Sequence, residues 1–188
     1  MTPKLEDRYR VRASVDIARP AAVVYDYLRD IETRLRVNPS YRLTGFEWLT
    51  PGPLRPGSRY RVRAAVGDTR LDYLCEVVEQ VEGERLVVRR MDGEATVSLT
   101  VTRLPGGCRL THEEEFPIPE EALQPEPGDL RAMVGKLFAA LADTDERVPL
   151  SESERGARTR AMVGELEQRL QRWLERVRRA IEKGTPAD

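Results

Sequence analysis

The chain has 188 residues, of which 40% are hydrophobic and 34% charged, so it can build a sizeable core beneath a polar surface. Its 31 basic and 32 acidic residues leave a formal net charge of −1, which argues against nucleic acid or an anionic membrane as a partner recruited by overall charge. There is no signal-peptide pattern and no apolar segment long enough to span a bilayer, so we expect a cytoplasmic protein with no transmembrane segment.

Cysteine and histidine are scarce. Cys75 and Cys108 are far apart in the sequence, and His112 is the only histidine. A disulfide framework needs more cysteines, and the common zinc sites need ligands at close spacing. Both cysteines fall in predicted strands, where a small buried thiol is the ordinary outcome. We therefore expect no metal and no other cofactor.

The first elements follow from two different periodicities. Residues 8–17 alternate between polar and apolar side chains, which predicts a half-buried strand. Pro20 suits the first turn of a helix, where its missing N–H costs nothing. A second short helix is predicted from Glu32 to about Val37 and is stopped by Asn38-Pro39. The apolar positions at helical spacing after Pro20 are Val23, Val24, Tyr27, Leu28 and Ile31.

From residue 41 to residue 116 the sequence consists of short β-rich runs separated by Pro and Gly. Turn pairs such as Gly67-Asp68 and Asp92-Gly93 lie between alternating runs, which is typical of hairpins. Consecutive hairpins predict an antiparallel meander of six strands, or seven strands with the first. The predicted strands are 42–49, 58–66, 69–79, 85–91, 94–103 and 108–116.

The last third of the chain is predicted to be helical. Apolar spacing predicts an amphipathic helix over about 129–142. Ser151 and Glu154 then form a capping-box pattern, which begins a long helix over about 152–183. Gly184 and Pro186 end it. One stripe of this helix carries Met162, Leu166, Leu170, Trp173, Val177 and Ile181.

This order of elements resembles the START-like superfamily, also called SRPBCC, and within it the polyketide cyclase/dehydrase-type bacterial proteins. The resemblance lies in VDIARPAAVVYDYLRD at 15–30, the strand start at 57–62, EVVEQVEGERLVVRR at 76–90 and LPGGCRLTHEEEF at 104–116. It implies an α+β helix-grip fold, in which a bent seven-stranded antiparallel sheet wraps the C-terminal helix. We accordingly expect residues 1–188 to form a single START-like domain, with a core at about 8–116 plus the helix at 152–183 and with an inserted helix at 129–142.

The resemblance also implies a cavity between the sheet and the last helix. Members of the superfamily bind lipids, sterols, polyketides, hormones or quinones there, and some catalyse cyclisation or hydrolysis. This chain departs from the pattern at Leu35-Arg36-Val37-Asn38-Pro39, where many members have a tryptophan. The helix at 129–142 is a second departure, and a lid, a dimer surface and plain buttressing are all open roles for it.

The arginines of the second meander strand are expected to face solvent. Strand alternation places Tyr60 and Val62 on the inner face, which leaves Arg59, Arg61 and Arg63 on the outer face. Acidic residues such as Asp72 and Glu76 can face them across the sheet. An ion-pair ladder therefore explains this stripe better than a phosphate or RNA contact does.

The last strand carries the unusual side chains. Leu110 and Phe116 fix which residues face inward, so His112 and Glu114 share their face. A buried carboxylate is costly unless it is paired, so a partner, a water-filled pocket or a ligand should accompany Glu114. Acid/base catalysis by the pair, a polar pocket lining without catalysis, and two groups at a solvated rim are the three alternatives.

Three functions remain open from the sequence. The first is binding or carriage of a hydrophobic or amphipathic small molecule, which should require a closed cavity of about 300 Å³ or more. The second is an aromatase/cyclase-type enzyme that uses His112 and Glu114. The third is a protein-interaction module that uses the 129–142 helix and the outer face of the sheet. A coiled-coil homodimer through the last helix is a further alternative. The expected pocket lining is Tyr60, Tyr73, Leu99, His112, Glu114, Phe116, Leu166, Leu170 and Trp173.

Overall fold

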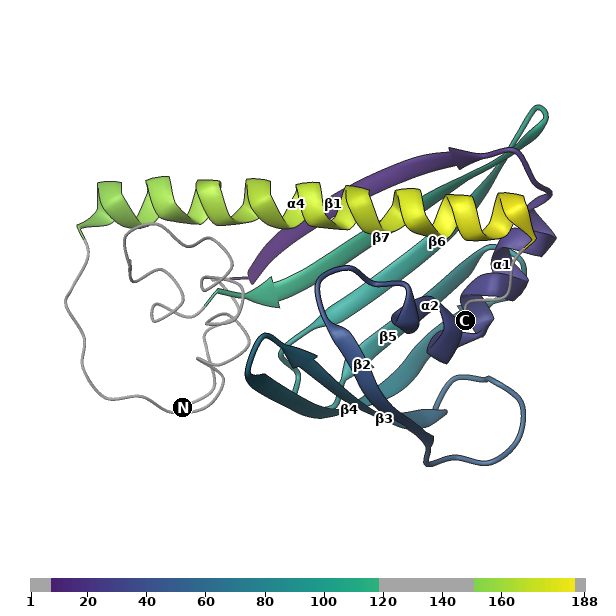
Figure 1. Ribbon diagram of the computed structural model, residues 1–188, viewed down its shortest axis with the longest axis horizontal. Coiled ribbons are helices and arrows are strands. Elements are labelled where there is room, and N and C mark those ends of the chain that lie inside the picture. Colours follow the sequence, from purple (N-terminus) through teal and green to yellow (C-terminus); the bar gives the residue numbers. More distant parts are fainter. Residues whose placement is uncertain (1–7, 119–150, 185–188) are drawn as a thin grey trace.

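The computed structural model describes residues 8–118 and 151–184, and the helix predicted at 129–142 lies outside these ranges. A seven-stranded antiparallel sheet and the long C-terminal helix α4 (Glu152–Lys183) dominate these residues. α4 crosses the sheet on the side that also holds the two short helices (Figure 1). This arrangement confirms the predicted helix-grip fold.

The sheet is built as a meander closed by the first strand. Its order is β1-β7-β6-β5-β4-β3-β2, so β1 and β2 are its two edges. The predicted strands are confirmed with end shifts of one or two residues. Their bounds are β1 (Arg8–Ile17), β2 (Arg42–Trp48), β3 (Arg59–Val66), β4 (Thr69–Val81), β5 (Arg85–Arg90), β6 (Thr96–Leu104) and β7 (Gly107–Pro117).

The helices after β1 are α1 (Ala21–Arg29) and α2 (Ile31–Arg36). Pro20 is the N-cap of α1 and not its first residue, because its carbonyl already accepts the N–H groups of Val23 and Val24 at 3.0 and 3.3 Å. The expected inner face of α1 was partly wrong. Val23 is 46% exposed, because the face that meets the sheet is formed by Ala21, Val24, Tyr25 and Leu28.

The predicted limits of α4 are confirmed. Ser151 and Glu154 form the capping box at its start, and Gly184 ends it with a left-handed backbone at φ +65°. Most of the predicted apolar stripe is buried, whereas Leu166 is only half-buried. No helix in the described parts of the chain is long and apolar enough to cross a membrane.

The interior contains two hydrophobic clusters. The first, here the α4 core, lies between α1, α4 and strands β1, β6 and β7. The second, here the α2 core, lies between α2 and strands β3, β4 and β5. The indole N–H of Trp173 on α4 donates to the backbone carbonyl of Arg34 on α2 at 3.3 Å, and this bond links the two clusters.

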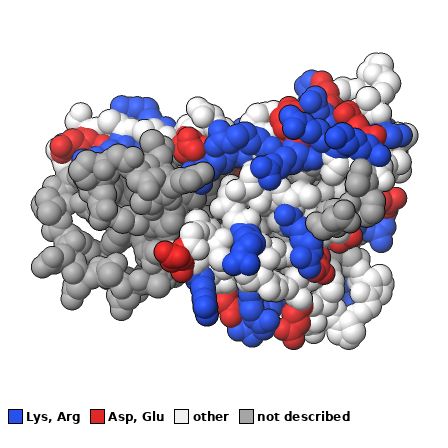
Figure 2. Space-filling view, viewed as in Figure 1, with Lys and Arg blue, Asp and Glu red and all other residues white. Residues whose placement is uncertain are grey.

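The outer face of the sheet carries the predicted ion-pair ladder. Arg59 pairs with Glu76 at 3.2 Å and Arg63 with Glu47 at 3.4 Å. Arg61 forms a bidentate pair with Asp72, with N–O distances of 2.7 and 2.6 Å. These arginines are therefore paired within the chain. On the face shown in Figure 2, basic side chains are dense along α4 but are interspersed with acidic ones.

Candidate functional site

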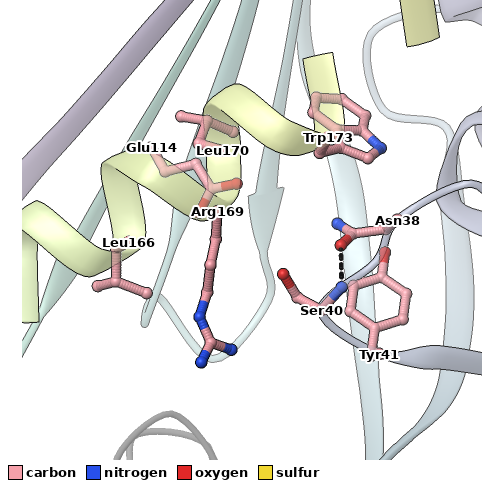
Figure 3. A pocket seen from close by; sticks show the side chains of 8 residues that line it. All are labelled: Asn38, Ser40, Tyr41, Glu114, Leu166, Arg169, Leu170 and Trp173. Atoms are coloured by element: carbon pink, nitrogen blue, oxygen red, sulfur yellow. Dashed lines mark hydrogen bonds between the residues drawn. The ribbon is translucent and has the colours of Figure 1, made fainter. Parts of the chain in front are cut away.

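A partly open pocket lies where α4, β7 and the loop between α2 and β2 meet. Its volume is about 90 Å³, which is well below the roughly 300 Å³ expected of a closed carrier cavity. The lining side chains converge on the opening from three separate parts of the chain (Figure 3). They are Asn38, Ser40, Tyr41, Glu114, Leu166, Arg169, Leu170 and Trp173.

Local structure sets the two walls of this pocket. On the loop side, the Oδ1 atom of Asn38 accepts the backbone N–H of Ser40 at 2.9 Å, which fixes the turn before Tyr41. On the helix side, Leu166, Leu170 and Trp173 recur at helical spacing and share one face of α4. The guanidinium of Arg169 is held by Glu165 at 2.9 Å, one turn earlier. The pocket is therefore apolar on its α4 side and polar at its mouth.

His112 lies beside this pocket and contacts two of its lining residues. Its Nε2 atom is 2.8 Å from Oε1 of Glu114, and its ring meets that of Trp173 edge-on with centroids 4.7 Å apart. His112 is only 5% exposed, whereas the side chain of Glu114 is 36% exposed. The 2.8 Å contact is poorly directed, so neither buried imidazole nitrogen has a hydrogen bond of normal geometry.

One lining residue, Tyr41, belongs to a group of three tyrosines on which the charge of Arg34 acts. Burial raises the pKa of Tyr41, Tyr60 and Tyr73 above the ordinary value, so their hydroxyls stay neutral at pH 7. The positive charge of Arg34 acts on the pKa of all three in the opposite direction, so Arg34 lies in their neighbourhood. Arg90 stacks on the ring of Tyr73, with its guanidinium carbon 4.9 Å from the ring centroid.

The expected lining residues divide into three groups. Glu114, Leu166, Leu170 and Trp173 line the pocket, and His112 lies directly beside it. Tyr60 and Tyr73 belong to the α2 core instead, because β5 and β6 separate β3 and β4 from β7 in the sheet. Leu99 and Phe116 are buried in the α4 core.

Sequence reasoning missed the loop residues Asn38, Ser40 and Tyr41, and also Arg169 and Arg34. For Arg34 a signal was present: it follows the buried Ile31 by three residues, so a helix places both on one face. For the loop residues there was none, because their position depends on where α4 packs.

The chemical repertoire of the site is limited. Burial raises the pKa of the Cys75 thiol to about 11, so this cysteine is not a reactive thiolate at neutral pH. Both cysteines are free and buried in strands, as predicted. No group of three metal-ligating side chains occurs within residues 8–118 and 151–184. What the site offers is apolar contact, proton exchange at His112 and Glu114, and hydrogen bonds from buried donors.

Comparison with known proteins identifies the family. The family model described as polyketide cyclase/dehydrase and lipid transport matches residues 8–146. The chain belongs to this family, within the START-like superfamily. A search of curated proteins returned no significant match.

Solved structures share the fold at low sequence identity. TTHA0849 from Thermus thermophilus is 15% identical with a TM-score of 0.59, covering 94% of this chain and 99% of that one. The Zhui aromatase/cyclase from a Streptomyces species is 15% identical with a TM-score of 0.58 and 94% coverage of both chains. A Deinococcus radiodurans protein is 19% identical with a TM-score of 0.54, covering 94% of this chain and 99% of that one. At such identities these likenesses establish the fold alone.

Proposed function

We propose that this protein binds a hydrophobic or amphipathic small molecule between the sheet and α4. The observation that carries this proposal is the imidazole of His112, 95% buried beside an open pocket with an apolar helical wall: its Nδ1 atom has no partner, and its Nε2 atom has only a poorly directed contact with Glu114. Buried polar atoms without partners are costly, so their retention at a pocket favours a ligand that supplies the partner. The family, whose description includes lipid transport, supports the same class of function.

The pocket volume of about 90 Å³ bears on how a ligand is held. A drug-sized molecule needs roughly 300 Å³ or more, so this pocket seats only one end of such a ligand without rearrangement. Its two walls come from different elements, the α2–β2 loop and α4. We therefore treat the pocket as the entrance of a cavity that widens toward His112 and Arg34 when a ligand enters.

Binding of a neutral fluorescent probe tests this proposal. N-phenyl-1-naphthylamine should bind the purified full chain saturably, at one molecule per chain. Leu166→Trp fills the pocket and should weaken binding about tenfold or more. Leu74→Trp is the matched control, because Leu74 is an exposed residue of β4, and it should change nothing. Absence of saturable binding, or equal binding by Leu166→Trp and the native chain, would refute the proposal.

A second candidate function is acid/base catalysis by His112 with Glu114, favoured by their 2.8 Å contact at the pocket. Native mass spectrometry separates it from carriage. The small molecules that co-purify with the native chain and with His112→Gln should be the same if the protein is a carrier. A chemically different molecule on the variant, such as an uncyclised precursor, would indicate turnover.

A further inference from the structure

Arg34 is a buried cation for which residues 8–118 and 151–184 provide no partner. It is 4% exposed, and its Nη1 atom is fully buried without a hydrogen bond. Its side chain forms no ion pair, hydrogen bond or ring contact with any residue in the described parts of the chain. Only its backbone is engaged, by Asp30 and by the indole of Trp173. Because an arginine cannot deprotonate in a protein, this positive charge is permanent.

The groups near Arg34 include neutral hydroxyls, a neutral thiol and one carboxylate, that of Glu114. Burial keeps the nearby hydroxyls of Tyr60 and Tyr73 and the thiol of Cys75 protonated at pH 7. Glu114, like Arg34, acts on Tyr41 and Tyr73, but its close contact is with His112. A buried guanidinium without an ion pair or a hydrogen bond is among the costliest arrangements that a protein can retain.

Other shielded arginines of the chain do have partners. Arg90, with a side chain 17% exposed, pairs with Asp92 and stacks on Tyr73. Arg169, with a side chain 16% exposed, pairs with Glu165. Arg34 is more buried than either and has neither kind of contact, so its missing partner is not a general feature of this fold.

Arg34 does not line the pocket, but it is next to two residues that do. Trp173 lines the pocket and is bonded to the Arg34 carbonyl, and Tyr41 lines the pocket and lies within the field of the Arg34 charge. A molecule that enters between Tyr41 and Trp173 therefore comes close to the part of α2 that carries Arg34. Its apolar part would remain against Leu166 and Leu170, which form the helical wall.

We propose that Arg34 binds the oxyanion of an amphipathic acid, a carboxylate, sulfonate or phosphate at one end of a hydrophobic molecule seated in this pocket. The guanidinium presents a planar fork of donors, which matches two oxygens of such a group. This inference rests on the proposed function and adds the charge of the ligand to it.

Two fluorescent probes that differ by one group test the inference. 8-Anilinonaphthalene-1-sulfonate carries the naphthylamine fluorophore of N-phenyl-1-naphthylamine plus an acidic group. Arg34→Gln should weaken binding of the sulfonate about tenfold or more, the loss typical of a charge-assisted hydrogen bond. Binding of the neutral probe should change by less than about twofold. Arg61→Gln removes an exposed, paired arginine from the outer face and should alter neither affinity.

The outcomes separate this inference from the proposed function. If Arg34→Gln binds the sulfonate as tightly as the native chain, or loses both probes equally, Arg34 does not bind the anion. If the native chain binds neither probe, the proposed function fails first. Near-ultraviolet circular dichroism reports folding. Should Arg34→Gln not fold, Arg34→Lys keeps the cation but not the fork, and it should still weaken the sulfonate selectively.

Competition then distinguishes the sources of the acidic group. Dodecanoate, dodecyl phosphate and neutral dodecanol share one alkyl chain and are added against the bound sulfonate. The two acids should compete at least about tenfold more strongly than the alcohol. The stronger acid identifies the preferred headgroup. Equal competition by dodecanol would overturn the inference.

Discussion

The interior of the α4 core and its boundary with the α2 core differ in how their buried polar groups are paired. In the α4 core, apolar side chains from α1, β7 and α4 have no exposed surface at all, as Val24, Leu28, Leu110, Leu174 and Val177 show. Where this core meets the α2 core, the chain instead buries Arg34 and His112, whose side-chain nitrogens make no hydrogen bond of normal geometry with the described residues. The centre of the α4 core is closely packed and apolar, whereas the place where the two cores meet breaks the rule that buried polar groups are paired.

The difference indicates a division of labour between stability and binding. Natural proteins tend to violate packing and pairing rules where function requires it, and other parts of the fold offset the cost. Here the α4 core supplies the stability. The region around Arg34 and His112 where the two cores meet, here the junction, keeps polar groups without hydrogen bonds beside a pocket. Substitutions in the two regions should therefore change the free energy of unfolding in opposite directions.

The largest effect is expected in the α4 core. Leu174→Ala should lower the free energy of unfolding by about 2–5 kcal/mol, because the residue is fully buried and its loss leaves a cavity. Urea denaturation measures the change. Leu74→Ala removes the same atoms from an exposed position and should cost less than about 0.5 kcal/mol. A similar cost at both positions would show that the α4 core is not tightly packed.

Substitution at the junction should stabilise the ligand-free chain. Arg34→Met keeps an unbranched side chain of similar length but removes the unpaired charge, so unfolding should require about 1–3 kcal/mol more. Saturating 8-anilinonaphthalene-1-sulfonate should reduce or reverse this gain, because only the native chain binds the probe tightly. A loss of stability in the ligand-free variant would mean that the guanidinium has a partner and that the comparison is wrong.

The fold was predictable because its signals are local. Alternation along Tyr9–Ile17 fixes the inner face of β1, and Gly67 and Gly106 adopt the positive φ values, +56° and +81°, that tight turns between strands need. The capping box at Ser151 and the glycine at 184 similarly fix both ends of α4. Each of these features depends on neighbours in sequence, so no tertiary information was required.

The candidate site was predictable only in part. Strand parity placed Glu114 on the pocket side, and helical spacing selected Leu170 and Trp173. Tyr41 could not be found in this way, because its position depends on how a loop after α2 approaches a helix more than a hundred residues later. Arg34 was missed for a different reason. Arginine is ordinarily exposed, so its helical spacing from the buried Ile31 did not lead to the expectation that it is buried too.

A smaller gain is expected at His112. His112→Phe keeps the edge-on contact with Trp173 and removes two buried nitrogens, so unfolding should require about 1 kcal/mol more. Urea denaturation of the ligand-free chain measures it. Leu99→Phe is a useful contrast, because it adds atoms to a filled position facing His112 and should destabilise the chain instead. If His112→Phe is clearly less stable, the imidazole is hydrogen-bonded in solution and the junction is better satisfied than we infer.

The smallest effect concerns pH and the rim of the pocket. A hydrogen bond from Arg169 lowers the pKa of Glu165 below its ordinary value of 4.5. A carboxylate with a lowered pKa in the folded state adds stability above its unfolded value and loses it as the pH falls through the folded value. The free energy of unfolding should therefore decrease below about pH 4.5, and Glu165→Gln should remove part of that decrease, at most about 0.5 kcal/mol after solvent screening. Denaturation series from pH 7 to pH 3 measure the difference.

The same substitution also tests whether Arg169, at the rim of the pocket, can replace Arg34. Glu165→Gln frees Arg169 from its ion pair, and we expect that adding it to Arg34→Gln does not restore sulfonate binding. Restored binding would show that an arginine at the rim can replace the buried one. The unpaired burial of Arg34 would then not be what binds the anion.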